Sequence, residues 1–374
     1  MAQYDDEGGD RREWQPEFVA EPSEDGPSDT TSEGPGGDSW TSPEALGDDV
    51  EEEQSLRPSN LDEFVGQART IENLRIALAA ARARSEAPDH VLLSGPPGLG
   101  KTSLARILAS ELGVALHATT GPALERPRDL VGILTQLQRG DVLFIDEIHR
   151  VPAAVEEYLY GAMEDFSIDF TLNEGPHARV VPLTLQRFML IGATTREGLL
   201  TGPFRARFGM LERLSPYTTD ELTAIVQRSA VRLGLTIAPT AAELLAGRSR
   251  GTPRVANRFL RRARDLAQVR GADELDAALA DETMARLAVD ENGLEEIDRR
   301  ILAFLGRSPG TPVGLKTIAA AIGESEDTIE EVFEPHLVRM GFLHRTARGR
   351  QITRDGCRAV GLDPDPADGS LFER

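Results

Sequence analysis

Cysteine and lysine are both scarce in this 374-residue chain, which holds one cysteine and two lysines among its 41 basic residues. The single Cys357 cannot form an internal disulfide and supplies no cysteine cluster for a metal, which favours a reducing compartment. No apolar run approaches the roughly 20 residues of a membrane-spanning helix, and the acidic N-terminus lacks the apolar segment of a secretory signal. We therefore expect a soluble cytoplasmic protein with no membrane partner.

Bases are also outnumbered: 62 acids against 41 bases give a net charge of −21 and an isoelectric point near 4.8. Such an average argues against nucleic acid and anionic membranes as partners. The acids, however, are concentrated in residues 1–54, which hold 18 acids and two arginines, whereas the other 320 residues carry 44 acids and 39 bases. The average charge therefore excludes no partner for the body of the chain.

Aliphatic residues are few in residues 1–54, which are rich in Asp, Glu, Gly, Pro and Ser. A segment of this composition cannot bury enough apolar surface to offset its conformational entropy, so we predict a disordered acidic tail. Its simplest role is to keep the protein soluble. Residues 359–374 are predicted to form a second, shorter tail.

From residue 55 onward, short apolar segments alternate with helical patterns. This alternation is typical of an α/β fold in which a parallel sheet is covered by helices on both faces. Polar and apolar residues alternate over 166–186, which predicts an inserted hairpin. The predicted strands lie at 91–94, 142–145 and 188–193, and the predicted helices at 61–64, 68–87, 101–112, 152–164 and 219–233.

Two smaller units follow the predicted sheet. Residues 219–289 have helical patterns throughout, and a third unit starts near Asn292. The helices of the third unit are predicted at 294–306, 315–321 and 327–340, followed by two apolar segments around a turn at 341–353.

The strongest chemical motif is Gly95-Pro-Pro-Gly-Leu-Gly-Lys101-Thr102, which follows an apolar strand and opens a helix. In such a loop, backbone N–H groups and the helix N-terminus surround phosphate oxygens, and the lysine reaches the terminal phosphates. The threonine hydroxyl is placed to bind Mg²⁺. Because the motif uses one of only two lysines in an arginine-rich chain, it predicts a nucleotide site that needs a compact ammonium.

A second motif, Val142-Leu-Phe-Ile-Asp146-Glu147, places two acids at the carboxyl end of an apolar strand. Ligands bind at this edge in open α/β sheets. Asp146 is predicted to hold Mg²⁺ through water, and Glu147 to polarise the attacking water. Two acids at a strand end are common in other proteins, so the prediction depends on the phosphate loop upstream. A plain surface residue is at least as good an interpretation of the nearby His149.

Three weaker features follow along the chain. Thr194, at the end of the strand 188–193, is a candidate sensor of the terminal phosphate, although threonine is common at strand ends. Arg205 and Arg207 suit an arginine finger that stabilises transition-state charge, in a neighbouring subunit's site if the protein forms a ring. Arg254 opens a predicted helix and can reach the phosphates.

In this order and spacing, the motifs resemble those of the AAA+ ATPases, and among them the chain is similar to the RuvB family of Holliday junction branch-migration motors. The resemblance covers residues from about 56 to 356. It implies a large P-loop AAA+ domain at 55–217, a helical lid at 218–290 and a winged-helix DNA-binding head at 291–358. The resembling segments are LRPSNLDEFVGQ (56–67), DHVLLSGPPGLGKTSLA (89–105), VLFIDEIHR (142–150), AMEDF (162–166), LIGATTREGLLTGPFRARFG (190–209), RGTPRVANRFLRR (250–262) and PVGLKTIAAAIGESEDTIEEVFEPHLVRMGFLHRTARGR (312–350).

The resemblance also implies an activity, cofactors and partners. The activity would be ATP-driven branch migration of four-way DNA junctions, with ATP and Mg²⁺ as cofactors. The chain would form a homo-oligomeric ring, a hexamer in this family, around duplex DNA. A RuvA-like junction-binding protein would dock on the hairpin 166–186.

Roles of single residues follow from the same resemblance, by matched position. The catalytic residues would be Lys101, Asp146, Glu147, Thr194 and Arg207, with Thr102 and Asp146 at the metal. The nucleotide would be contacted by Leu56, Arg57, Gly98, Lys101, Thr102, Ser103, Glu164, Asp165, Phe166, Arg207, Tyr217 and Arg254.

The predicted helix 327–340 would be the recognition helix of the winged-helix head, which normally enters the major groove. Its acids are Asp327, Glu330, Glu331 and Glu334. Such a face repels phosphates, so we expect DNA to meet the arginine-rich wing that follows, through contacts that do not read sequence. By matched position Arg345 and Arg350 would contact DNA, whereas Glu326 occupies a position that is basic in relatives. A solvated arginine face is the alternative.

Two other functions stay open. A clamp-loader-like AAA+ machine would share the nucleotide motifs but carry a helical collar in place of the wing. A nucleotide-switched DNA-binding initiator or regulator would need a recognition helix that reads sequence, and the acidic helix argues against one. The acidic tail 1–54 is a candidate competitor with DNA for the arginines of the wing.

Overall fold

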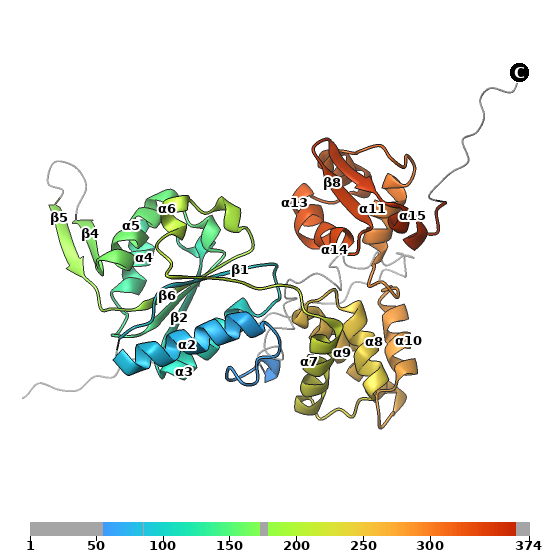
Figure 1. Ribbon diagram of the computed structural model, residues 1–374, viewed down its shortest axis with the longest axis horizontal. Coiled ribbons are helices and arrows are strands. Elements are labelled where there is room, and N and C mark those ends of the chain that lie inside the picture. The colour runs from blue at the N-terminus through green and yellow to red at the C-terminus, as the bar shows by residue number, and fades with distance from the viewer. Residues whose placement is uncertain (1–54, 85, 173–178, 364–374) are drawn as a thin grey trace, which may run out of the picture. The chain divides into compact units, whose positions relative to one another are not determined.

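The computed structural model describes residues 55–84, 86–172 and 179–363 (Figure 1). The acidic tail 1–54, the turn of the predicted hairpin and residues 364–374 lie outside the described residues, so the predictions about them stay predictions. Within the described ranges, no helix is both long and apolar enough to cross a membrane.

Five parallel strands form the central sheet, in the order β2-β3-β6-β1-β7. The three central strands are the predicted ones, and their apolar residues are buried. Because β3, β6 and β1 are neighbours, their carboxyl ends meet at one edge of the sheet. The strands are β1 (Val91–Ser94), β2 (Leu116–Thr120), β3 (Val142–Asp146), β6 (Met189–Thr194) and β7 (Met210–Arg213).

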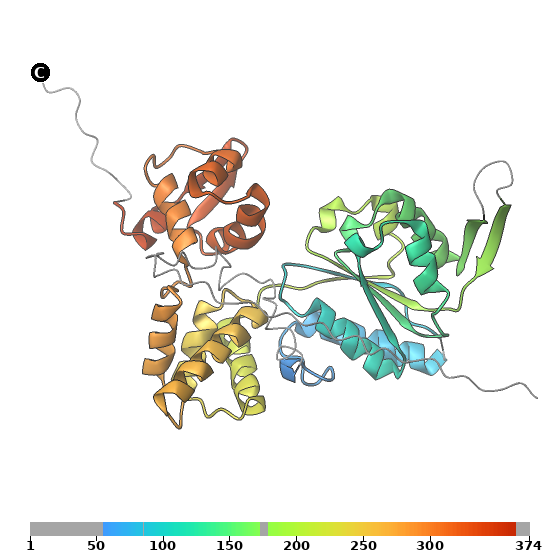
Figure 2. The same ribbon diagram turned by 180° about the vertical axis from the view of Figure 1, so that it is seen from behind.

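Helices cover both faces of the sheet, as the alternating pattern predicted (Figures 1 and 2). Successive strand residues point to opposite faces, so Val91 and Leu93 pack in the cluster that contains α2 and α3, whereas Leu92 packs with α4 and α5. The α/β fold is therefore confirmed. The helices are α2 (Ala68–Arg84), α3 (Lys101–Leu112), α4 (Pro127–Leu134) and α5 (Ala153–Glu164), with shorter turns η2 (Gly121–Ala123), η3 (Ile148–Arg150), η4 (Glu197–Leu199) and α6 (Gly202–Arg205).

The inserted hairpin consists of β4 (Ser167–Leu172) and β5 (Arg179–Thr184), which pair antiparallel as a separate two-stranded sheet. It follows α5 directly and precedes β6, where the alternation over 166–186 predicted it. A Cβ on Gly161 would lie 2.8 Å from the carbonyl oxygen of Ser167, so a glycine allows β4 to start close to α5. Figure 1 shows the two strands projecting beyond the helices that cover the sheet.

A helical segment follows the sheet, as predicted. Its first helix begins with a capping box, in which Glu221 N–H donates to Thr218 Oγ1 at 3.2 Å and Thr218 N–H donates to Glu221 Oε2 at 2.8 Å. Its buried side chains continue the hydrophobic cluster that covers the α2 and α3 face of the sheet. The helices are α7 (Thr219–Arg232), α8 (Pro239–Arg248), α9 (Pro253–Arg270) and α10 (Ala277–Arg286).

The C-terminal segment has a hydrophobic cluster of its own, which includes Leu302, Ile318 and Phe333. The predicted helix 327–340 is present as three consecutive stretches, of which the middle one is a π turn. The elements are α11 (Glu296–Leu305), α12 (Leu315–Ile322), α13 (Glu326–Thr328), η5 (Ile329–Phe333), α14 (Glu334–Arg339), β8 (Leu343–Thr346), β9 (Gly349–Ile352) and α15 (Arg354–Ala359).

Several local predictions differ from the structure. The helix predicted at 61–64 is wrong: the segment is irregular, although Asn60 Oδ1 accepts a hydrogen bond from Glu63 N–H at 2.9 Å, as a helix-capping side chain does. Helix α2 ends at Arg84 rather than at residue 87. The elements β2, α4, β7 and α15 were not predicted.

Candidate active site

A cavity of about 330 Å³ opens at the carboxyl edge of the central strands and continues to the first turn of α9. This volume lies in the range of small-molecule binding sites. Its lining joins segments that are far apart in the sequence. The lining residues are Leu56, Arg57, Pro58, Phe64, Val65, Pro97, Gly98, Leu99, Gly100, Lys101, Thr102, Ser103, Asp146, Glu147, Thr195, Tyr217, Ile225, Arg228, Pro253, Arg254, Asn257 and Glu331.

The loop between β1 and α3 surrounds one end of this cavity. Gly95, Gly98 and Gly100 all have positive φ angles, of 136°, 76° and 102°, which L-residues with a Cβ rarely adopt. A Cβ on Gly95 would also lie 2.4 Å from the carbonyl oxygen of Leu214. The glycines therefore allow the loop to turn tightly and deliver the chain to the N-terminus of α3 at Lys101.

Lys101 is nearly buried, with 7% of its surface exposed. Its Nζ donates to the carbonyl oxygens of Gly95 at 2.7 Å and Pro96 at 2.8 Å. Burial lowers the pKa of Lys101 to about 8; the Asp146 carboxylate opposes this shift and the Arg254 guanidinium adds to it. A buried ammonium beside a helix N-terminus favours an anionic ligand, as the sequence motif predicted.

The two acids of the second motif line the same cavity. Asp146 Oδ1 accepts a hydrogen bond from Glu147 N–H at 3.0 Å. Glu147 has a φ of 48°, and its carboxylate forms an ion pair with Arg150 at 2.8 Å. The backbone fits here because Gly121 has no side chain: a Cβ on it would lie 2.4 Å from the carbonyl oxygen of Glu147.

Thr194 is placed differently from the prediction. Its side chain is buried and its Oγ1 lies 3.0 Å from His149 Nδ1, while the same oxygen accepts the N–H of Arg196 at 3.0 Å. The neighbouring Thr195 lines the cavity and Thr194 does not. Burial lowers the pKa of His149, which is consistent with a neutral ring that accepts from the Thr194 hydroxyl. His149 is therefore not a plain surface residue.

The far side of the cavity is formed by the start of the described chain and by the helical segment. Leu56, Arg57 and Tyr217 line it, as does Arg254 at the second position of α9. The hydroxyl of Tyr217 donates to the carbonyl oxygen of Leu99 at 3.0 Å, and burial raises its pKa, so it stays protonated. These residues lie where the sequence placed a nucleotide.

Four predicted nucleotide contacts lie outside this cavity. The Nη2 of Arg207 lies 3.3 Å from Glu164 Oε1 at the end of α5, and its guanidinium lies over the Tyr160 ring at 4.2 Å. Asp165 caps α5, and the Phe166 ring packs near the rings of His90 and Phe188. Arg207, Glu164, Asp165 and Phe166 therefore form a separate group on the chain.

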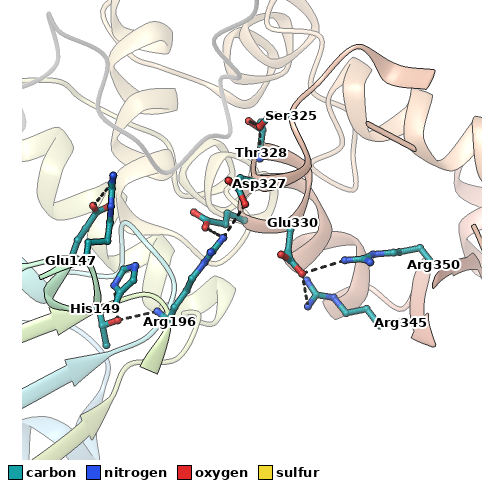
Figure 3. A network of polar contacts seen from close by, with 12 residues as sticks. Glu147, His149, Arg196, Ser325, Asp327, Thr328, Glu330, Arg345 and Arg350 are labelled. Atoms are coloured by element: carbon teal, nitrogen blue, oxygen red, sulfur yellow. Dashed lines mark hydrogen bonds and ion pairs between the residues drawn. The ribbon is translucent and has the colours of Figure 1, made fainter. Parts of the chain in front are cut away.

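Arg345 and Arg350 lie in the wing strands β8 and β9, as predicted, but an acid beside them is placed differently from the prediction. Glu334, which was expected to show a repelling charge, is 1% exposed and binds both arginines. Its Oε1 accepts from Arg345 Nε at 2.6 Å and from Arg350 Nε at 3.1 Å, and its Oε2 accepts from Arg350 Nη2 at 3.1 Å. Glu330 contacts the same two arginines, at 3.7 Å and 3.3 Å (Figure 3). The acids and the bases thus neutralise each other.

Comparisons with known proteins match the whole described body of the chain. The family model described as the Holliday junction DNA helicase RuvB P-loop domain matches residues 56–214. The RuvB AAA lid domain matches 217–290, and the RuvB C-terminal winged helix domain matches 291–361.

Similar proteins cover nearly the same length. A relative from Prosthecochloris aestuarii, named Holliday junction branch migration complex subunit RuvB, is 55% identical over 324 residues, which cover 86% of this chain and 94% of the relative. A relative of the same name from Myxococcus xanthus is 54% identical and covers 88% of this chain and 97% of its own. The structure of the Thermotoga maritima RuvB Holliday junction branch migration motor has 48% identity and a TM-score of 0.76, and covers 83% of this chain and 99% of its own. The chain belongs to the RuvB family, with a P-loop AAA+ domain, a lid and a winged-helix domain.

Proposed function

We propose that this chain is an ATP-hydrolysing motor that drives branch migration of four-way DNA junctions in recombination and repair, together with a RuvA-like partner. One observation carries the proposal: Lys101, Asp146 and Glu147 converge on one cavity in a chain that ends in a winged helix. The relatives are named as subunits of a Holliday junction branch migration complex, which supports the same function.

The cavity suits a nucleoside triphosphate. Gly98, Lys101, Thr102 and Ser103 offer backbone N–H groups, an ammonium and hydroxyls to the phosphates at the start of α3. The Thr102 hydroxyl and the Asp146 carboxylate are hard oxygen donors of the kind that hold Mg²⁺, which neutralises charge on the phosphates when it is bound. Leu56, Arg57 and Tyr217 are proposed to hold the base and sugar end.

Glu147 is proposed to orient the attacking water. Glu147 lines the cavity, its Oε2 is paired with Arg150, and Oε1 is the oxygen proposed to accept a water proton. Thr195 offers a further hydroxyl to the cavity, and the adjacent Thr194 is held by His149 and by the N–H of Arg196. Arg254 reaches the cavity from α9, so a bound nucleotide would draw the lid toward the core.

The site is completed by a neighbouring copy in this proposal. Arg207, Glu164, Asp165 and Phe166 lie outside their own cavity, so they would serve the nucleotide of the next subunit in a ring. A ring that encloses duplex DNA, with six subunits as the resemblance implies, satisfies this requirement. Arg207 would then supply the finger that stabilises the transition state.

The same proposal assigns roles to the domains, the wing and the inserted hairpin. The large domain is proposed to span 55–217 and the lid 218–290, after the tail 1–54. The head begins at 291 and extends past the predicted boundary at 358, because α15 ends at Ala359 and Leu362 packs against the head's hydrophobic cluster. The wing would contact DNA phosphates through Arg345 and Arg350, and the hairpin 166–186 would dock on the RuvA-like partner. The protein would act in the cytoplasm.

The experiment that tests the function uses a synthetic four-way junction, with and without the cognate RuvA-like protein. We expect ATP-dependent dissociation of the junction that needs the partner and is lost in Lys101→Ala. A Lys316→Ala variant is the matched control, because Lys316 is the only other lysine and is exposed on α12. Activity on linear duplex alone, or sequence-dependent binding without junction dissociation, would contradict the proposal.

A further inference from the structure

Arg196 lies two residues beyond the end of β6, beside the strand ends that line the cavity. Its guanidinium contacts the acidic helix of the winged-helix head, where it forms an ion pair with Glu331 and lies 3.5 Å from Asp327 Oδ1. Its backbone N–H donates to Thr194 Oγ1 at 3.0 Å. Figure 3 shows Arg196 reaching from the strand end toward this helix. Arg196 therefore links the end of β6, next to the cavity-lining Thr195, with the head.

Glu331 brings a head carboxylate into the nucleotide cavity. It is among the lining residues, together with Lys101, Asp146 and Glu147. A bound polyphosphate would add several negative charges beside that carboxylate and would also attract Arg196. The Arg196–Glu331 ion pair and a bound nucleotide therefore oppose each other.

The same helical stretch also binds the wing, and Arg196, Glu330, Glu331 and Arg345 line one shared cavity. Asp327 and Glu331 are four residues apart and share the side that meets Arg196, whereas Glu330 and Glu334, also four apart, hold Arg345 and Arg350. A movement of this stretch away from the core would therefore carry the wing arginines with it.

The contact is weak enough to be reversed. The side chains of Arg196 and Glu331 are 36% and 42% exposed, and ion pairs with that much solvent contribute little stability. By contrast, the carboxylate of Glu334 is buried and bound by two arginines, so the wing stays attached to its helix. Of the two contacts, the one between the head and the ATPase core is therefore the one that breaks when the head moves.

We propose that Arg196 and Glu331 are positioning residues that dock the head on the ATPase core in the absence of nucleotide and release it when nucleotide binds. The identity of the wing as a DNA contact rests on the proposed function, but the docking itself does not. Coupling between head docking and nucleotide binding is reciprocal. If nucleotide weakens docking, then docking weakens nucleotide binding. A substitution that removes both the docking contact and the Glu331 charge must therefore tighten nucleotide binding.

The first test measures nucleotide affinity without DNA. We expect Glu331→Gln to bind a fluorescent non-hydrolysable ATP analogue about fivefold or more tightly than the unsubstituted chain, the lower end of ordinary coupling. Glu324→Gln is the matched control, because it makes the same charge change in the same domain and Glu324 is not among the residues that line the cavity. Equal affinities for Glu331→Gln and Glu324→Gln would overturn the proposal.

The second test measures docking by energy transfer between dyes on Ile76→Cys in α2 and Lys316→Cys in α12, both exposed positions. Cys357 is buried, which protects it from labelling. We expect the analogue to lower the transfer in the unsubstituted chain, and Arg196→Ala to lower it without nucleotide. The charge swap Arg196→Glu with Glu331→Arg, combined with Asp327→Asn so that no acid faces the new carboxylate, should restore docking. It should also keep the head docked when nucleotide is added, because an arginine in the cavity attracts phosphates. The proposal would be overturned if nucleotide did not change the energy transfer in the labelled chain that keeps Arg196 and Glu331.

These readouts are independent of motor activity. If the junction assay fails while affinity and energy transfer behave as expected, the proposed function is wrong and the docking contact stands. If branch migration is normal in Arg196→Ala and the two readouts do not change, the docking proposal is wrong and the function stands.

Discussion

Arg207 Nη2 lies 3.3 Å from Glu164 Oε1 of the same chain, and neither residue lines the nucleotide cavity. The guanidinium also lies over the ring of Tyr160 and donates to the carbonyl oxygen of Pro203 at 2.9 Å. These contacts hold the arginine outside its own cavity, with 22% of its side chain exposed. An arginine that lies outside its own cavity fits the proposed role of a finger for a neighbouring copy of the chain.

Replacement of Arg207 is therefore expected to separate binding from hydrolysis. Arg207→Ala should bind ATP with nearly unchanged affinity, because the residue is not in its own cavity, and should lose hydrolysis by about 10³-fold or more, as arginine fingers do. Nucleotide binding by fluorescence and steady-state phosphate release measure the two effects. Normal hydrolysis in this variant would exclude a finger supplied by the neighbour.

A mixing experiment shows whose site the arginine serves. The Arg207→Ala variant keeps its nucleotide cavity, and the Lys101→Ala variant keeps its Arg207. In a mixed ring, a site is complete wherever the cavity of an Arg207→Ala subunit meets the arginine of a Lys101→Ala neighbour. We expect the mixture to hydrolyse ATP although each variant alone does not. The Arg205→Ala variant is the control, because Arg205 forms an exposed ion pair with Glu197 and should hydrolyse ATP normally.

The buried Lys101 predicts a pH dependence of nucleotide binding. Its pKa is lowered to about 8, and the anionic nucleotide favours its charged form. Below pH 8 the ammonium is already present, so this group does not change the affinity. Above pH 8 the free chain must take up a proton to bind, so the affinity falls, by up to about tenfold per pH unit.

The measurement is nucleotide binding between pH 7 and 10 in the presence of EDTA, so that no metal contributes. Arg replaces Lys101 in the control variant, since a guanidinium stays charged throughout this range. Its affinity, although lower because of the different shape, should not fall with pH in the same way. A flat profile for the unsubstituted chain would contradict the lowered pKa.

The parts that the sequence predicted well are those determined by local residue patterns. The loop before Lys101 needs its glycines for positive φ angles, and the strand before Asp146 is a continuous apolar run, so both could be recognised directly. β2 and β7 were missed because they lie at the edges of the sheet and are only partly buried, which weakens their apolar pattern.

Long-range pairs between side chains were beyond the sequence. The acids of the predicted recognition helix were counted as a repelling face, because nothing local shows that Glu334 is buried between Arg345 and Arg350. Thr194 and Thr195 are adjacent and identical in type, and the direction of each side chain is decided by the strand pleat and by His149. The Thr194–His149 contact depends on β6 and η3 lying side by side in the fold, which no local pattern shows.

Arg250 and Asp298 form a fully buried ion pair that predicts a stability effect. The Nε of Arg250 also donates to the carbonyl oxygen of Gly293 at 2.8 Å, so the pair joins the lid to the first turn of α11. Asp298→Ala would leave the guanidinium buried without its charge partner and should cost about 3–5 kcal/mol in the free energy of unfolding. Chemical denaturation measures this loss.

The double variant Arg250→Met with Asp298→Ala tests the explanation. Once both charges are removed, no unpaired charge is buried, so the double variant should be more stable than Asp298→Ala alone. A double variant that loses as much as or more than Asp298→Ala would mean that packing at α11, and not the unpaired charge, dominates the effect. The sign of the difference therefore decides between the two causes.

The wing provides the last prediction, because its two arginines are not equally available. Arg345 is 48% exposed and donates Nε to Glu334, with its Nη1 at 3.7 Å from Glu330, whereas Arg350 is 17% exposed and uses both Nε and Nη2 for Glu334. Arg345→Ala alone should therefore weaken duplex binding without uncovering the buried carboxylate. If each arginine contacts one phosphate, replacing both should reduce the slope of log affinity against log salt by about 2.

Lys316→Ala is the control for charge, since it removes an exposed cation of the same domain outside the wing. Thermal unfolding of each variant shows whether Arg350→Ala disturbs the fold by leaving Glu334 unpaired, in which case Arg345→Ala carries the test. The measurement is duplex affinity across a salt series. Unchanged affinity and slope in Arg345→Ala with Arg350→Ala would exclude the wing as the DNA contact, because counterion release must fall when phosphate contacts are lost.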